Sequence, residues 1–149
     1  MTTGAWVLVI AVVAALVFGL YRAATDGRFG GTRRVRGADG AASETGESSL
    51  LAYTPWADAL GERATLLQFS SAFCAPCRAT RRILETVSAS QPGVAHIEVD
   101  AEQHLDLVRR LGILRTPTTI VLDAAGHELV RAAGAPTKAQ VLSALPPSA

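Results

Sequence analysis

Residues 73–78, which read Phe73-Cys74-Ala75-Pro76-Cys77-Arg78, contain the only two cysteines of the chain. They lie where the apolar strand pattern of Ala64–Ser70 gives way to the helical pattern of Ala75–Ser90. Two thiols separated by two residues at a helix start can close a small disulfide ring, and the positive end of the helix dipole favours a thiolate on the first sulfur. The stretch therefore indicates redox chemistry.

The two cysteines are expected to play different parts. Cys74 lies just outside the helix and is expected to be the attacking thiol, whereas Cys77 lies one turn inside and is more shielded. Cys77 would then resolve the mixed disulfide and leave a Cys74–Cys77 bridge. Pro76 suits the first helical turn, where its missing N–H costs little and its fixed φ helps to hold the ring geometry.

A second motif, Thr116-Pro117-Thr118, opens a later apolar stretch. A C-x-x-C pair alone occurs in many unrelated proteins. A Cys-Ala-Pro-Cys turn after one strand, combined with Thr-Pro-Thr at the opening of another, is a much more specific signal.

From Tyr53 onwards, strand and helix patterns alternate in the order βαβαββα after a short first helix, which predicts a mixed sheet with helices on both faces. The expected strands are Ala64–Ser70, Val94–Val99, Pro117–Leu122 and Glu128–Ala132, the last two joined by a turn at Asp123-Ala124-Ala125-Gly126. The expected helices are Tyr53–Leu60, Ala75–Ser90, one begun by Asp100 and Gln103 and closed by Gly112, and one begun by Thr137 and Gln140. Expected core-facing residues are Ala79, Ile83, Leu84 and Val87 in the second helix, Leu105, Val108 and Leu111 in the third, and Val141, Leu142 and Leu145 in the last.

These motifs resemble the thioredoxin family over about Leu50 to Leu145. The matching segments are Thr65-Leu66-Leu67-Gln68-Phe69, the Cys-x-Pro-Cys-Arg turn, Val94 to Asp100, Gly112-Ile113, Thr116-Pro117-Thr118 and Gly134. The resemblance implies a three-layer α/β fold with a mixed central sheet and a thiol-disulfide oxidoreductase whose only redox group is the Cys74/Cys77 pair, with no bound cofactor. It also implies that Thr116 and Pro117 form a cis-proline loop that faces the dithiol and a substrate segment. A proline at the first residue of a strand is also ordinary in other proteins.

The sequence departs from the family pattern at several positions. Phe73 replaces the usual Trp, and Ala75 replaces Gly between the cysteines. Gln68 stands where the family has a buried carboxylate that helps to deprotonate the resolving cysteine, and His96 stands where a lysine is common. Because Gln cannot accept a proton at neutral pH, help for Cys77 must come from His96, from water or from no group at all.

The helix that follows the cysteines also lacks a proline common in the family, with Arg82 in its place. Arg78, Arg81 and Arg82 could stabilise a Cys74 thiolate or select acidic partners, although a solvated helix face explains them as well.

The N-terminal region is apolar, with no charged residue from Gly4 to Leu20. As a helix, Gly4 to Tyr21 would extend roughly 27 Å, close to the thickness of a bilayer core. A cleaved signal peptide is the alternative, but no Lys or Arg precedes the apolar run and no Ala-x-Ala exit is clear. Trp6 and Tyr21 bracket the run where aromatic rings favour membrane interfaces. We therefore expect one uncleaved transmembrane helix.

Five arginines follow this helix: Arg22, Arg28, Arg33, Arg34 and Arg36. By the positive-inside rule they place the flank and the domain behind it in the cytoplasm, with the N-terminus outside. They could also contact anionic lipid or form a solvated basic linker. The expected division is a transmembrane helix at 1–21, a basic segment and small, polar, flexible linker at 22–49, and a thioredoxin-like domain at 50–149.

The predicted function is thus a membrane-tethered thiol-disulfide oxidoreductase that reduces protein disulfides and draws electrons from an unknown donor. An extracytoplasmic reductase or oxidase, or a tethered binding module without turnover, is the alternative. A net charge of +1 does not indicate a nucleic-acid partner. A zinc site is disfavoured because His96, His104 and His127 lie on different elements and have no ligand-like spacing.

Overall fold

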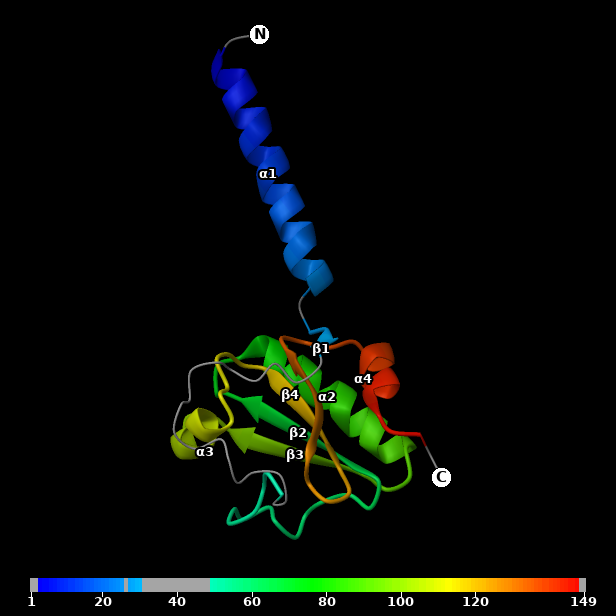
Figure 1. The fold of residues 1–149 in the computed structure, drawn as a ribbon. Helices are drawn as coiled ribbons and strands as arrows, with labels where there is room; N and C mark the ends of the chain where they lie inside the picture. Colours follow the sequence, from blue (N-terminus) through cyan, green and yellow to red (C-terminus); the bar gives the residue numbers. More distant parts are fainter. Residues whose placement is uncertain (1–2, 26, 31–48, 148–149) are drawn as a thin grey trace.

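The computed structural model of the chain describes residues 3–25, 27–30 and 49–147. A mixed five-stranded sheet with the strand order β1-β5-β4-β2-β3 forms its centre (Figure 1). Strands β2 and β3 are parallel, and the other neighbouring pairs are antiparallel. The strands are β1 (Phe29–Gly30), β2 (Ala64–Ser70), β3 (Val94–Asp100), β4 (Thr118–Asp123) and β5 (Glu128–Ala133).

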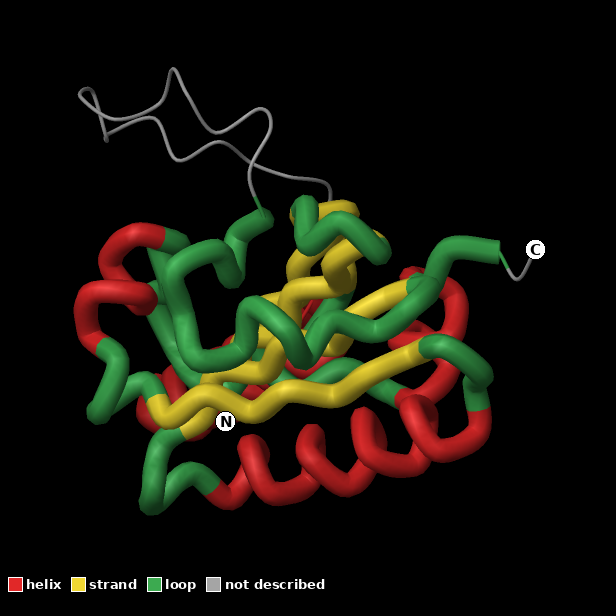
Figure 2. Tube along the Cα trace, turned by 90° about the horizontal axis from the view of Figure 1, so that it is seen from below, coloured by secondary structure: helices red, strands yellow, loops and turns green. Residues whose placement is uncertain are grey.

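All seven residues of β2 are buried, because β2 is a central strand and is covered on both faces. One face packs under α2 (Ala75–Ser90) and α4 (Lys138–Ala144), with Leu66, Leu84 and Val141 in a shared apolar cluster. The other face packs under α3 (Leu105–Arg110) and the segment around Leu51. Figure 2 shows the long helix α2 running along one side of the strands. The three layers of the expected α/β fold are therefore present.

One of the four residues predicted to face the core from α2, Ala79, does not face it. Cys77, Thr80, Leu84 and Val87 are the buried residues of α2, whereas Ala79 is exposed. Ala79 follows Cys77 by two positions, which on an α-helix places it on nearly the opposite side. The first turn therefore buries the second cysteine rather than an alanine.

Two of the predicted helices differ from the structure, and the first of them is absent. Residues 50–58 form successive turns rather than a helix, with Thr54 N–H bonded to the Leu51 carbonyl and Ala57 N–H to the Thr54 carbonyl. Between these turns Tyr53 adopts φ of 63°, a left-handed conformation that interrupts any helix. The predicted helix Tyr53–Leu60 is therefore absent from this segment.

The third predicted helix begins later than expected. The carboxylate of Asp100 accepts hydrogen bonds from the Glu102 N–H and the Gln103 side chain, so it closes a local turn instead of capping a helix. Helix α3 starts only at Leu105, which is itself half exposed. Leu107 is buried in place of the predicted Leu105, and Leu111 is buried as predicted.

Other local predictions are confirmed. Gly126 has φ of 83° in the turn between β4 and β5, as the hairpin required. Thr137 and Gln140 form a reciprocal capping box at the start of α4. Gly112 follows α3 with φ of 62°.

The N-terminal helix α1 spans Thr3–Thr25, and it is the one helix in the described part of the chain that is long and apolar enough to cross a membrane. None of its residues from Gly4 to Arg22 is buried. Strand β1 follows almost at once and pairs with β5, although residues 22–49 were expected to form a basic segment and a flexible linker. Phe29 explains the difference, because it packs against the apolar cluster under α2 and α4. Arg33, Arg34, Arg36 and residues 37–48 lie outside the described residues.

Candidate active site

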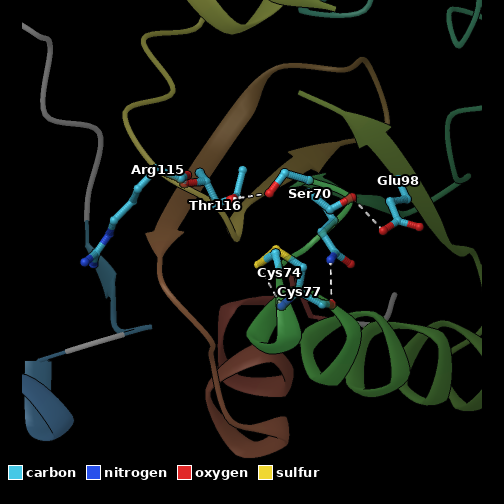
Figure 3. Close-up of a disulfide and its surroundings, with 9 residues drawn as sticks. Ser70, Cys74, Cys77, Glu98, Arg115 and Thr116 are labelled. Atoms are coloured by element: carbon cyan, nitrogen blue, oxygen red, sulfur yellow. Dashed lines mark hydrogen bonds between the residues drawn. A yellow bond between two sulfur atoms is a disulfide. The ribbon is translucent and has the colours of Figure 1, made fainter. Parts of the chain in front are cut away.

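The cysteine pair lies at the start of α2, at the carboxyl end of the central strand β2 (Figure 3). Cys74 and Cys77 form a disulfide with their Cα atoms 5.2 Å apart. Cys74 is the N-cap residue, and its Sγ accepts a hydrogen bond from the Cys77 N–H at 3.1 Å. An N–H group aimed at this sulfur, together with the helix dipole, stabilises negative charge on Cys74 once the disulfide is reduced.

The two sulfurs differ in access, as the positions of the residues suggested. Cys77 is only 2% exposed, whereas Cys74 is partly exposed. Ala75 and Pro76 lie on the surface between them, with Pro76 in the first turn of α2. Phe73 is 99% exposed just before Cys74. A partner can therefore reach Cys74 past Phe73, while Cys77 faces the sheet.

The loop before β4 lies beside the dithiol loop. Its Thr116–Pro117 peptide bond is cis. The Thr116 hydroxyl lies 3.2 Å from the Ser71 hydroxyl, which connects this loop to the turn that carries Cys74 (Figure 3). The Pro117 carbonyl accepts a hydrogen bond from the Gly134 N–H at 2.8 Å. The structure thus brings together the two motifs that the sequence separates by about forty residues.

Gln68 lies beneath the dithiol and is fully buried. Its Nε2 donates to the Cys77 carbonyl at 3.0 Å, and its Oε1 lies 3.2 Å from Nε2 of His96. The amide nitrogen and the amide oxygen of Gln68 therefore each have a hydrogen-bond partner, although the side chain is buried and neutral. The contact reaches the backbone of Cys77 rather than its sulfur.

His96 is partly buried on β3 at the far side of Gln68. Burial lowers the pKa of His96 below its usual value, an effect that the positive charge of Arg81 reinforces and that Glu85 and Glu98 oppose. A neutral imidazole is the form that can accept a proton. His96 is thus joined to Cys77 only through the amide of Gln68.

Glu98 belongs to the same polar layer, although the sequence reasoning did not single it out. Its carboxylate accepts a hydrogen bond from Ser70 at 2.7 Å and forms an ion pair with Arg81 of α2 (Figure 3). The alternation of His96 and Glu98 along β3, opposite an arginine-bearing helix, was the signal that could have identified it. Arg78 and Arg82 remain exposed on α2.

The histidines do not converge on the cysteines. His104 packs edge-on against Trp56, and His127 lies 3.3 Å from a carboxylate oxygen of Asp123. Among the described residues, no three His, Cys, Asp or Glu side chains come together as a metal site would require.

Known proteins match the same part of the chain. The thioredoxin family model matches residues 50–146. Thioredoxin-2, mitochondrial, of Schizosaccharomyces pombe is 31% identical over 77 residues, which cover 52% of this chain and 57% of that protein. Thioredoxin domain-containing protein 2 of Homo sapiens is 36% identical over 58 residues, 39% of this chain and 10% of that protein. The chain thus matches little more than half the length of one curated relative and a tenth of the other.

Solved structures share the fold at lower identity. The thioredoxin NaTrxh of Nicotiana alata superposes with a TM-score of 0.50 at 23% identity, over 55% of this chain and 70% of that one. A mutant thioredoxin of Halobacterium salinarum gives 0.51 at 21% identity, over 59% of this chain and 80% of that one. With the family model covering most of the chain, and with a cysteine pair at a helix start beside a cis-proline loop, the chain belongs to the thioredoxin family.

Proposed function

We propose that this protein is a membrane-anchored thiol-disulfide oxidoreductase that reduces protein disulfides through Cys74 and Cys77. The observation that carries the proposal is the geometry of the pair, with a partly exposed Cys74 at the N-cap of α2 and a buried Cys77 one turn later. The cis-Thr116–Pro117 loop adjoins the pair, and an extended substrate segment would lie along it.

The reaction transfers two electrons from the dithiol to the substrate disulfide. The Cys74 thiolate attacks one substrate sulfur, forms a mixed disulfide and releases the other substrate sulfur as a thiolate. Cys77 then loses its proton to water or to His96 and attacks Sγ of Cys74, which releases the second substrate thiolate and leaves the Cys74–Cys77 bridge. A separate thiol or dithiol reductant must reduce this bridge before the next turnover.

Proton removal from Cys77 has no carboxylate at position 68 to assist it, and the Glu98 carboxylate in the same layer is already bound by Ser70 and Arg81. Gln68 binds the Cys77 backbone and His96 from opposite ends, so it holds the layer in place without accepting a proton itself. Water or the neutral His96, acting through a rearranged contact, would receive the proton. Phe73 and Ala75 leave the approach to Cys74 open.

We further propose that α1 is retained as the membrane anchor and that the domain lies in the cytoplasm. The support is the apolar surface of α1 on every side and the arginines after it. Protein substrates and the electron donor would then both be cytoplasmic or at the cytoplasmic face of the membrane.

Two measurements test these proposals separately. The full chain, purified in detergent and reduced, is expected to reduce the disulfides of insulin stoichiometrically and to titrate as a two-electron couple against glutathione. A domain that binds insulin but does not reduce it would instead be a binding module.

For orientation, a reporter fused after Ala149 is expected to read cytoplasmic, and neutral replacements of Arg22, Arg28, Arg33, Arg34 and Arg36 should weaken that orientation. An extracytoplasmic reading in the unmutated protein contradicts the assignment and favours an exported reductase or oxidase.

A further inference from the structure

The segment between α1 and the domain is anchored to the sheet. Phe29 and Gly30 form the edge strand β1 and pair with Ala132 and Arg131 of β5, and the Gly27 N–H donates to the Ala133 carbonyl at 3.1 Å. Phe29 also packs against the apolar cluster under α2 and α4. The chain therefore leaves α1 and joins the domain within a few residues.

Gly27 fits this docking contact because it has no side chain. It has φ of 71°, and a Cβ added there would lie 2.2 Å from the Ala135 carbonyl oxygen. At Gly30, on the same short strand, an added Cβ meets nothing within 4 Å. The two glycines thus provide one position where a methyl group must displace the segment and one where it is harmless.

The register of the sheet places the docked segment at the dithiol end. Ala133 is opposite Thr118 in β4, and Thr118 is opposite Phe69 near the end of β2, which leads directly to the dithiol. Three strand spacings of about 4.8 Å separate β1 from β2, or about 14 Å. The Ala133 carbonyl that binds Gly27 also accepts from Arg115 at 2.5 Å, in the loop before the cis bond. In Figure 3 the blue N-terminal ribbon lies on the side toward which Arg115 extends.

The distance from the end of α1 to the dithiol follows from these contacts. Thr25 and Gly27 are two residues apart and can be separated by about 7 Å at most. Together with the width of the sheet, this holds the dithiol loop within about 20 Å of the end of α1. A flexible linker over residues 22–49, as expected from the sequence, would have an end-to-end dimension of about 30 Å, to which the distance across the domain would be added.

Exposed apolar side chains flank the dithiol at this end. Phe73 precedes Cys74 and is 99% exposed, and Leu114 precedes the cis-proline loop and is 90% exposed. Such a pair suits a partner segment that carries aromatic side chains, such as the Trp and Tyr residues that are enriched at membrane interfaces.

We propose that β1 holds the redox site against the membrane surface and thereby selects disulfides in membrane-proximal segments of membrane proteins. The proposal rests on the membrane anchor and the reductase activity proposed above. With a freely swinging tether, the segment after β1 would set how far the dithiol extends from the membrane. In this proposal the pairing of β1 with β5 sets that distance.

The test uses the reduced full chain in phosphatidylcholine vesicles, in single turnover, with two single-span reporter peptides that carry the same disulfide hairpin. One reporter holds the hairpin five residues from the membrane, and the other holds it about 60 Å away on a 40-residue helical spacer. We expect the near hairpin to be reduced at least about tenfold faster than the far one. Insertion of 24 Gly/Ser residues between Thr25 and Gly27 should reduce this ratio to below about threefold, because the domain can then reach outward.

Matched controls identify β1 as the cause. The same insertion between residues 31 and 48 comes after β1 and should leave the ratio unchanged. Gly27→Ala should lower the ratio, whereas Gly30→Ala should not. Equal rates for the two reporters in the unmutated protein, or equal effects of the two insertions, overturn the proposal. Insulin reduction is measured for every variant, and if none reduces insulin it is the proposed reductase activity that fails, not the reach of the domain.

Discussion

The two longest helices in the described part of the chain, α1 and α2, place their apolar residues in opposite ways. In α2 the apolar residues form one stripe, with Leu84 and Val87 fully buried against the sheet and Arg78, Arg81 and Arg82 in solvent. In α1 apolar residues surround the helix, and Leu16, Val17 and Leu20 are each at least 60% exposed. Helix α2 therefore has its packing partner within the chain, whereas no described residue covers α1. The cysteine pair lies at the start of α2, and α1 is the helix that we propose as the membrane anchor.

The largest expected effect concerns the first turn of α2. Cys74→Ser should abolish disulfide reduction, because the accessible nucleophile is lost. Cys77→Ser should leave a nucleophile that forms a mixed disulfide but cannot be released from it, so that covalent adducts accumulate on Cys74. Non-reducing gel electrophoresis and mass spectrometry of the adducts measure both outcomes. Adducts trapped on Cys77 in the Cys74→Ser protein would reverse the assignment.

The same Leu→Ala substitution in both helices tests whether α2 packs against the domain and α1 does not. Leu84→Ala should lower the free energy of unfolding of the domain by about 2–5 kcal/mol, because it leaves a cavity beneath α2. Leu16→Ala, at a side chain that is 61% exposed, should change it by less than about 0.5 kcal/mol. Urea denaturation in detergent, followed by the fluorescence of the domain, measures both. Equal losses would mean that α1 packs against the domain and that the contrast between the helices is false.

A third prediction concerns the layer beneath the first turn of α2. Gln68→Asp and Gln68→Asn should each lower the free energy of unfolding by about 1–3 kcal/mol, since both shorten the side chain that binds Cys77 and His96. Only the aspartate supplies a base, and burial raises the pKa of a carboxylate at such a site. Gln68→Asp should therefore speed resolution of the mixed disulfide near and above neutral pH, whereas Gln68→Asn should not. Stopped-flow rates from pH 6 to 9 that are the same in both variants would show that proton removal from Cys77 is not limiting.

The smallest effect is the pH dependence of stability that comes from His96. Burial lowers its pKa, so below the ordinary value of 6.5 the unfolded chain binds a proton that the folded protein does not. The stability contribution of neutral His96 is complete above pH 6.5 and is lost as the pH falls through the lowered value. The loss of unfolding free energy between pH 7.5 and pH 5 should be smaller in His96→Gln than in the unmutated protein. His104→Gln, on the other side of the sheet, serves as the control, and an unchanged loss in His96→Gln contradicts the prediction.

Much of the redox domain could be predicted from local sequence. The bounds of β2 and α2 were predicted as the structure has them, because the apolar run of Ala64–Ser70 and the helical period after Cys74 are both strong signals. The capping box at Thr137 and the turn at Gly126 likewise depend on nearest neighbours alone. The errors arose where local and tertiary preferences compete. Tyr53 gives no sign in the sequence of its left-handed backbone, and Asp100 can cap a helix or close a turn equally well.

The family, the redox pair and the long apolar helix can be read from the amino-acid sequence, because each depends on residue types at short spacing. Folding in three dimensions was needed to show that Glu98 joins the polar layer, that Gln68 connects Cys77 to His96, and that β1 docks on β5 at the dithiol end of the sheet. These features depend on strand register and on contacts between residues distant in the sequence. A two-residue strand such as Phe29–Gly30 has too few side chains to show a period. Its pairing depends on backbone hydrogen bonds to β5 and on the packing of Phe29 against the apolar cluster under α2 and α4.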